Sequence, residues 1–245
     1  PNNLNYVKEE ALTDEMIDIA LSTGKYIFDG REANRKLKQN PKVMLYAVKQ
    51  DLNNIHYLSK NALTDEIIKY VIEQDPDNLN YVDSCHLTDK MIDFAFSTGK
   101  YVFDSRKASY ELKQNPKVML YAVKQNPNNL NYVLGKALTD EIIDFALSTG
   151  KYIFDGREAN RKLKQNPKVM LYAVKQDPNN LNYVEDEALT DEMIDIALST
   201  KKYIFDGREA SYKLIQNPKV MLEAVKQDPN NLNYVKEEAL TDEMI

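Results

Sequence analysis

The chain has 245 residues and a formal net charge of −6, and 43% of its residues are hydrophobic. Binding to nucleic-acid phosphates needs clustered positive charge, so this acidic balance argues against a nucleic-acid partner. No apolar run in the sequence reaches the roughly 20 residues that a membrane helix needs, and the one cysteine, Cys85, cannot form an internal disulfide.

Two short motifs recur along the chain at the same intervals. L-T-D begins at Leu12, Leu63, Leu87, Leu138, Leu189 and Leu240, at spacings of 51, 24, 51, 51 and 51 residues, and N-L-N-Y-V with its variants follows the same series. The short interval indicates that the 51-residue unit consists of two modules, of 24 and 27 residues, and that the second was dropped between residues 52 and 75. Such internal repetition predicts stacked modules that hold their shape by packing on their neighbours.

The 24-residue module begins with D-P-N-N-L-N-Y-V, which predicts a helix of one to two turns. Asp177 would cap it, Pro178 would occupy its first position, and Leu181 and Tyr183 would pack inward. A longer helix is expected after Thr13 as its cap. We expect Gly24 to end this helix in a left-handed conformation. Its buried face is predicted to contain Met16, Ile17, Ala20 and Leu21.

The 27-residue module begins with G-K-Y-I-F-D, which is expected to form a short helical counterpart with a less certain boundary. Asn40 and Pro41 predict the start of its long helix, and Lys49 lies near the end. The face predicted to be buried contains Val43, Met44, Ala47 and Val48. Tyrosines and methionines at repeated positions are interpreted as core, as are Ile27 and Phe28, although an aromatic ladder could also stack bases. The same interpretation covers Tyr6, Tyr26, Tyr46 and Met16.

An alanine recurs at the centre of the predicted faces and would let neighbouring helices approach closely. It occurs at Ala20, Ala47, Ala95, Ala122, Ala146, Ala173, Ala197 and Ala224, and Val71 replaces it in the shortened unit. These patterns predict an all-α fold, an α-solenoid of short helical hairpins that forms one continuous array. Its modules are residues 1–23, 24–50, 51–74, 75–98, 99–125, 126–149, 150–176, 177–200, 201–227 and 228–245.

The run A-V-K-Q-D-P-N-N-L-N-Y-V at residues 173–184 resembles an approximately fifty-residue helical tandem repeat of unknown function found in bacteria and large DNA viruses. The resemblance extends over nearly the whole chain and departs at residues 52–75 and at Lys201, which replaces a glycine. It implies an all-helical array with no catalytic or binding residues to carry over. With the single cysteine, it favours an intracellular location in a cytoplasm, a host cytoplasm or a virion.

Three features that resemble chemical sites have simpler explanations. S-T-G-K at Ser22, Ser97 and Ser148 lacks the earlier glycine and the following Ser or Thr of a phosphate-binding loop. His56 and the Cys85–His86 pair are single substitutions without a second ligand pair for a metal. Repeated acids such as Asp14 fit helix starts. We therefore expect no enzyme, no cofactor and no metal.

Variation between the copies marks the candidate partner-binding positions. Arg35, Tyr110, Arg161 and Tyr212 occupy one position, and Lys8 and Glu185 belong to the three-residue loop after N-Y-V. The loops read Lys8-Glu9-Glu10, Ser59-Lys60-Asn61, Asp83-Ser84-Cys85, Leu134-Gly135-Lys136, Glu185-Asp186-Glu187 and Lys236-Glu237-Glu238. Neutral drift at exposed positions is the alternative interpretation.

Residues 229–245 repeat residues 1–17 letter for letter, which favours a segment of a longer array or an end that docks on another copy. The sequence thus leads to two functional hypotheses. The first is a non-enzymatic scaffold or structural element of a larger assembly, such as a virion or a filament, which contacts protein partners or further copies end to end. The second is a soluble adaptor that binds one protein or peptide along the groove of the solenoid.

Overall fold

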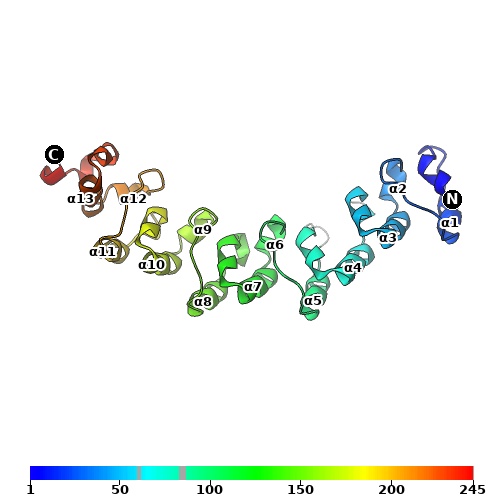
Figure 1. The fold of residues 1–245 in the computed structure, drawn as a ribbon, viewed down its shortest axis with the longest axis horizontal. Helices are drawn as coiled ribbons and strands as arrows, with labels where there is room; N and C mark the ends of the chain where they lie inside the picture. The colour runs from blue at the N-terminus through cyan, green and yellow to red at the C-terminus, as the bar shows by residue number, and fades with distance from the viewer. Residues whose placement is uncertain (60–61, 83–86, 245) are drawn as a thin grey trace. The chain divides into compact units, whose positions relative to one another are not determined.

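The computed structural model describes the chain apart from residues 60–61, 83–86 and 245. In this described part the regular structure is helical throughout, with α-helices and 3₁₀ helices and no strand (Figure 1). The predicted all-α class is therefore confirmed. The chain divides into two compact units, Pro1–Ser109 and Tyr110–Ile245. Among the described residues no helix has both the length and the apolar character needed to span a membrane.

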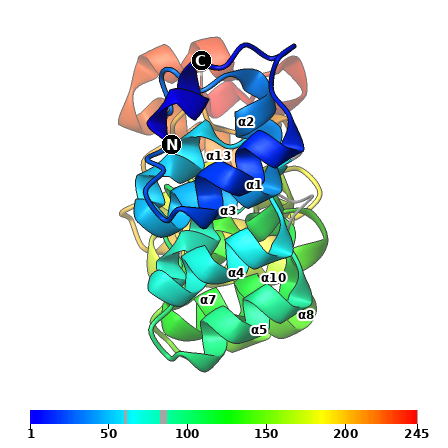
Figure 2. The ribbon, with the colours of Figure 1, turned by 90° about the vertical axis from the view of Figure 1, so that its right-hand side faces the viewer.

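The described residues of unit 1 form four longer α-helices, a short α-helix and 3₁₀ helices. In chain order they are η1 (Asn2–Tyr6), α1 (Asp14–Ser22), α2 (Arg35–Gln39), α3 (Pro41–Gln50), η2 (Leu52–Tyr57), α4 (Asp65–Gln74), η4 (Pro76–Tyr81) and α5 (Asp89–Ser97). The longer helices α1, α3, α4 and α5 pack side by side in chain order (Figure 2). The short helix α2 packs on α3.

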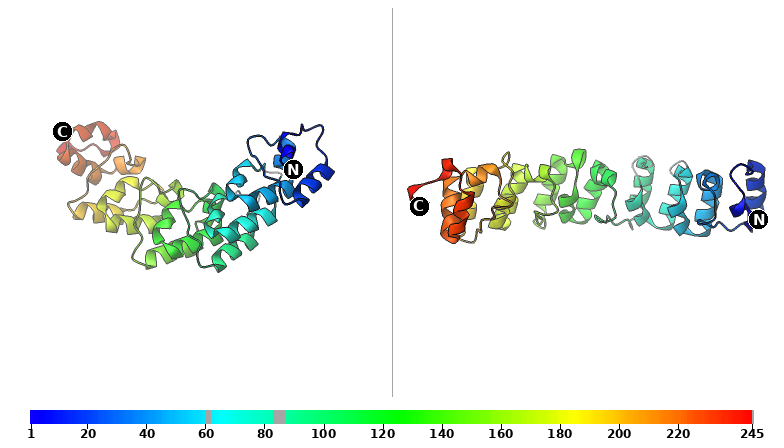
Figure 3. Two further views of the ribbon diagram at one scale, coloured as in Figure 1. Left: turned by 45° about the vertical axis from the view of Figure 1, so that its right-hand side comes forward. Right: turned by 90° about the horizontal axis from the view of Figure 1, so that it is seen from above.

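Unit 2 follows the same local order. Its elements are α6 (Tyr110–Gln114), α7 (Pro116–Gln125), η5 (Pro127–Tyr132), η6 (Gly135–Ala137), α8 (Asp140–Ser148), α9 (Arg161–Lys164), α10 (Pro167–Gln176), η7 (Pro178–Tyr183), α11 (Asp191–Ser199), α12 (Tyr212–Ile215), α13 (Pro218–Gln227), η8 (Pro229–Tyr234), η9 (Glu237–Ala239) and η10 (Asp242–Met244). The longer helices α7, α8, α10, α11 and α13 again contact each other in sequence, as the yellow-to-red part of Figure 3 shows for the last three.

The expected caps begin the long helices. The hydroxyl of Thr13 accepts the amide hydrogen of Met16 at 3.3 Å at the start of α1. Asn40 accepts the amide hydrogens of Lys42 at 3.0 Å and Val43 at 3.2 Å, and Pro41 is the first residue of α3. Each cap satisfies helix N–H groups that have no partner within the helix, which is why these residue types fix the helix starts.

The long helices of the 24-residue modules end as predicted. Gly24 follows the end of α1 with φ of +63°, and Gly99 and Gly150 adopt the same left-handed conformation after α5 and α8. Lys201 takes this place after α11 and also has a positive φ, of 57°. A side chain with a Cβ is disfavoured there, so Lys201 holds a strained conformation that glycine tolerates freely.

The D-P-N-N-L-N-Y segment forms a short helix, as expected. In unit 2 it is the 3₁₀ helix η7, with Asp177 as the cap that accepts the amide hydrogen of Asn179 at 2.9 Å and Pro178 as the first residue. Leu181 is fully buried, whereas Tyr183 is only half-buried. The prediction of an inward-packed Leu181 is confirmed, whereas Tyr183 is buried only in part.

The prediction of a short helix at G-K-Y-I-F-D is wrong. Residues 25–29 form no helix, and the short helix α2 begins later, at Arg35. The same holds in unit 2, where residues 151–155 precede α9 without helical structure. Asparagine and glutamine side chains from neighbouring segments form hydrogen bonds with the backbone N–H and C=O groups of these residues. A helix is therefore not needed to satisfy them.

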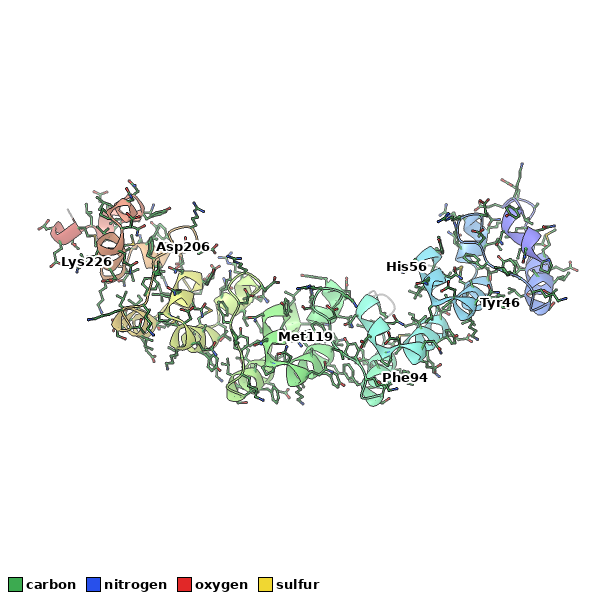
Figure 4. All side chains as sticks on the ribbon, in the orientation of Figure 1. Tyr46, His56, Phe94, Met119, Asp206 and Lys226 are labelled. Carbon is green, nitrogen blue, oxygen red and sulfur yellow. The ribbon has the colours of Figure 1, made fainter. Side chains whose placement is uncertain are left out.

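The core runs between the long helices of each unit and the short elements above them. Val43, Met44, Ala47 and Val48 are buried as predicted. The recurring alanines are also all buried, as is Val71 in the shortened unit. Met119 in α7 is another fully buried methionine, and Figure 4 shows it between helices of unit 2.

Three of the residues named as core by the sequence, Tyr6, Met16 and Ile27, are exposed, and Tyr6 is 67% exposed. Met16 is 44% exposed, whereas Met193, at the equivalent position of α11, is 1% exposed because α11 packs on α10. In the described structure no earlier long helix covers the corresponding face of α1. Ile27 is 62% exposed, although its neighbours Tyr26 and Phe28 are buried. Its exposure has a different cause, because Asn2 and Asn5 hydrogen-bond to the Ile27 backbone and hold the segment extended with this side chain outward.

Candidate functional site

The extended segment at residues 151–155 is held in place by two asparagines of the preceding 3₁₀ helix η5. Asn131 donates its side-chain amide to the carbonyl of Ile153 at 2.9 Å, and its Oδ1 accepts the hydroxyl of Tyr152 at 2.8 Å and the amide hydrogen of Asp155 at 3.2 Å. Asn128 accepts the amide hydrogen of Ile153 at 2.8 Å. The backbone of Ile153 is thus bound at both of its polar groups.

A glutamine from the following long helix completes this clamp. Gln176, the last residue of α10, donates its side-chain amide to the carbonyl of Tyr152. With both sides of the segment bound, its side chains alternate as in a strand. Tyr152 is fully buried and Phe154 is 6% exposed, whereas Ile153 between them is 64% exposed.

The same clamp occurs wherever a complete 27-residue module follows N-L-N-Y. The tyrosine hydroxyls of Tyr26, Tyr101 and Tyr203 donate to Oδ1 of Asn5, Asn80 and Asn182 at 2.6, 2.9 and 2.8 Å. The outward aliphatic residues of the four copies, named here the clamped aliphatic positions, are Ile27, Val102, Ile153 and Ile204. They are 62, 56, 64 and 67% exposed.

Each clamped aliphatic residue has a lysine two positions before it on the same extended segment. These exposed lysines are Lys25, Lys100, Lys151 and Lys202. Residues two apart in an extended segment point to the same side, so each copy presents a positive and an aliphatic side chain together. The asparagine clamp occupies the N–H of Ile153 and one acceptor position of its C=O, so an added strand could not use the N–H for pairing.

The shortened unit lacks both the clamp asparagine and the extended segment that it would bind. His56 occupies the position of Asn5, Asn80 and Asn131, and there no Y-I-F segment follows before the next D-P-D-N-L-N-Y-V. The structure leaves His56 exposed on η2 (Figure 4). Asn5, Asn80, Asn131 and Asn182 each bind an extended segment, and His56 replaces this asparagine where that segment was dropped.

Burial changes the acid–base chemistry of the clamp tyrosines. Desolvation raises the pKa of Tyr152 above its ordinary value, and the nearby carboxylate of Asp155 adds to the effect. Tyr26 and Tyr203 show the same direction, with burial as the main cause and Asp29 and Asp206 as the added charges. A neutral phenol keeps its proton, so it remains a hydrogen-bond donor to the asparagine.

The sequence-predicted site residues lie elsewhere on the surface. Arg35, Tyr110, Arg161 and Tyr212 are each the first residue of a short helix, namely α2, α6, α9 and α12, and all four are exposed. Lys8 is exposed in the loop after η1. The variable helix position is thus a surface position in both units, as the sequence predicted.

Two of these predicted residues contact each other. Nε of Arg161 lies 3.3 Å from Oε2 of Glu185, and the Glu185 side chain is only 29% exposed. The variable loop and the variable helix start therefore form one surface in unit 2. Part of this surface is occupied by the contact between Arg161 and Glu185 within the chain itself.

The remaining candidates of the sequence provide no chemical site. Cys85 and His86 lie outside the described residues, as does Ile245. Within the part of the chain that the structure describes, no group of His, Cys, Asp and Glu has the arrangement of a metal site. Unit 2 has a shallow groove between the end of α10 and Lys202, whose lining includes Val174, Asp177 and Ile196.

The comparisons with known proteins yield no match, whether with family models, curated proteins or solved structures. Sequence reasoning missed the clamped aliphatic positions because it assigned Ile27 to a core. Two patterns could have indicated them: the alternation in Tyr26-Ile27-Phe28 and the pairing of each N-L-N with a later Y-I-F or Y-V-F.

Proposed function

We propose that this chain is a non-enzymatic helical-repeat scaffold, an α-solenoid that serves as a structural element of a larger assembly such as a virion or a filament. It acts through protein–protein contacts, with protein partners or with further copies of the array end to end. It uses no catalytic residue, cofactor, metal or nucleic acid, and the resemblance to the fifty-residue tandem repeat is part of this proposal.

One observation carries the proposal. The same clamp holds an aliphatic side chain outward in each complete copy, with more than half of each side chain exposed. Each of these side chains stands on a backbone fixed from both sides, so presenting it to a partner costs little conformational entropy. Equivalent surface features on successive modules are what repeat scaffolds use to engage extended partners.

The sequential packing of the long helices within each unit supports the solenoid architecture. Each long helix packs on the next long helix in the chain. These helices are α1, α3, α4 and α5 in unit 1 and α7, α8, α10, α11 and α13 in unit 2. A compact domain of this length would have a radius of gyration of about 18 Å. We expect small-angle X-ray scattering to give a clearly larger value, and a value near 18 Å would contradict the solenoid.

Sedimentation velocity over a range of concentrations tests the function. The scaffold proposal expects the sedimentation coefficient to rise with concentration as copies associate. It also expects the variant Ile153→Ser/Ile204→Ser to change the binding of assembly partners while its circular dichroism stays that of the parent chain. A matched variant, Lys151→Ser/Lys202→Ser, separates the aliphatic contribution from that of the neighbouring charge.

The groove beside Lys202 favours a second candidate, a soluble adaptor that binds one protein or peptide. Its lining combines the apolar Val174 and Ile196 with the charged Asp177 and Lys202, so it offers both apolar and charged contacts to a peptide. This candidate expects a chain that stays monomeric at high concentration and binds one partner at a fixed ratio. Growth of the assembly with concentration would exclude it.

A further inference from the structure

The loop Glu185-Asp186-Glu187 lies between two short helices of unit 2, α9 before it and α12 after it. The amide hydrogen of Glu185 is donated to the carbonyl of Lys164, at the end of α9, at 3.2 Å. The amide hydrogen of Lys213, the second residue of α12, is donated to Oδ1 of Asp186 at 2.7 Å. The loop therefore touches elements of two different modules.

On the α9 side the contacts use both outer acids of the loop. Glu185 pairs with Nε of Arg161 at 3.3 Å. Glu187 accepts the side-chain amide of Gln165, which follows the last residue of α9, at 3.1 Å. These contacts complement the charge of α9, whose sequence R-K-L-K is basic.

On the α12 side Asp186 performs the task of a helix cap. Ser211 stands at the cap position of α12, but its hydroxyl makes no hydrogen bond to the helix, and its oxygen is buried without a partner in the described structure. The carboxylate of Asp186 accepts the otherwise free amide hydrogen of Lys213 instead, and the Lys213 ammonium donates to the carbonyl of Asp186 at 3.0 Å.

Two other short helices carry their own caps and show how α12 differs from them. α2 and α9 are capped by their own Asn34 and Asn160, which accept the amide hydrogens of Leu37 at 3.0 Å and Leu163 at 3.1 Å. The loop position that precedes α9 and corresponds to Asp186 is Gly135, which has no side-chain acceptor. The helix α9, which caps itself, thus follows a loop without a side-chain acceptor, whereas α12, which lacks its own cap, follows a loop that supplies one. Before α2, which Asn34 caps, the corresponding loop residue is Glu9.

We infer that the Glu185–Glu187 loop is an intramolecular latch in which Asp186 caps the short helix of the next module. An ionised carboxylate is a strong acceptor at a helix N-terminus, where it also meets the positive end of the peptide dipoles. Glu185 and Glu187 fix the other end of the loop on α9.

Hydrogen exchange at the amides of Leu214 and Ile215 in the full chain measures the latch. Loss of a helix cap corresponds to about a fivefold change in an opening equilibrium. We expect Asp186→Ala to speed exchange in α12 by about this factor and Asp186→Asn, which keeps an acceptor, to have a smaller effect. Glu237→Ala, which removes the corresponding acid of the next loop, is the matched control and should leave α12 unchanged.

Restoration by a second substitution separates the latch from a general loss of stability. Ser211→Asn would give α12 the cap that Asn160 gives α9, so Ser211→Asn/Asp186→Ala should exchange as slowly as the parent chain. Two outcomes would overturn the inference: unchanged exchange in α12 after Asp186→Ala, or exchange in the double variant that stays as fast as in Asp186→Ala. Neither outcome bears on the scaffold function.

Discussion

The hydroxyl of Tyr152 donates to Oδ1 of Asn131 at 2.8 Å, and this bond joins residues 21 positions apart in the chain. Asn131 belongs to the end of one module and Tyr152 to the beginning of the next. The pair recurs as Asn5–Tyr26, Asn80–Tyr101 and Asn182–Tyr203. The pair joins a buried phenol to a buried amide beside an exposed aliphatic residue.

Removal of the clamp amide should destabilise unit 2. Asn131→Ala leaves the Tyr152 hydroxyl, the Ile153 carbonyl and the Asp155 amide without their partner, and buried polar groups left unpaired cost about 1–3 kcal/mol each. We expect the free energy of unfolding, measured by urea denaturation, to fall by about 3 kcal/mol. Asn233→Ala, at the equivalent but exposed position, should change it by less than about 0.5 kcal/mol. Equal effects of the two variants would argue against the clamp.

Alkaline pH should weaken the fold through the clamp tyrosines. Burial raises the pKa of Tyr26, Tyr152 and Tyr203 above the ordinary value of 10.0, so the folded state keeps protons that the unfolded state loses. Their contribution to stability is therefore complete below pH 10 and declines as the pH rises above it. Urea denaturation at several pH values above neutrality measures the decline.

The tyrosine origin of this decline can be checked separately. The variant Tyr26→Phe/Tyr152→Phe/Tyr203→Phe should be less stable at neutral pH, because three hydroxyl bonds are lost, and should show a shallower loss above pH 10. Tyr110→Phe, at a residue that is 64% exposed, is the control and should keep the slope of the parent chain. A triple variant with an unchanged slope would assign the alkaline effect to other groups.

Replacement of Lys201 by glycine should stabilise the chain. Lys201 has φ of 57°, in the left-handed region that costs a residue with a Cβ about 1 kcal/mol. We expect Lys201→Gly to raise the free energy of unfolding by up to about 1 kcal/mol, measured by urea or thermal denaturation. The reverse substitution, Gly150→Ala, meets no atom within 4 Å but has φ of +65°, so it should lower stability by a similar amount.

Gly156 is required for a close ring contact. A Cβ built there would lie 2.5 Å from ring carbons of Tyr183, whose ring centroid is 6.2 Å from that of Phe154. Gly156→Ala should push the Tyr183 ring away and reduce the free energy of unfolding by about 1–3 kcal/mol. Because the cost comes from one contact, Gly156→Ala/Tyr183→Ala should be more stable than the sum of the two single effects predicts. Simple additivity in this double-mutant cycle would contradict the steric explanation.

Much of the helical fold could be predicted from the sequence because its determinants are local. Thr13, Asn40 and Pro41 act within the helices they begin, and Gly24 acts on the helix it ends. The positions of the buried alanines followed from helical periodicity alone. Short-range hydrogen bonds and a 3.6-residue period are present in any stretch of chain long enough to form one helix.

The candidate site was predicted only in part. Arg35, Tyr110, Arg161 and Tyr212 were correctly expected at the surface, because exposed positions tolerate variation between the copies. The pairing of Arg161 with Glu185 was not foreseen, since it joins residues of different modules. Ile27 was assigned to the core because hydrophobicity alone does not say which side of an extended segment is buried.

The sequence by itself thus determined where the long helices begin, end and bury their apolar face, since those choices are made by neighbours within a few residues. Only the tertiary structure decided that Tyr152-Ile153-Phe154 is extended and that Ile153 faces outward, because side chains of Asn128, Asn131 and Gln176 bind its backbone. It also decided that Asp186 caps a helix 27 residues further along. Hydrogen bonds between distant segments replace those of a local helix, and their partners become neighbours only when the modules pack.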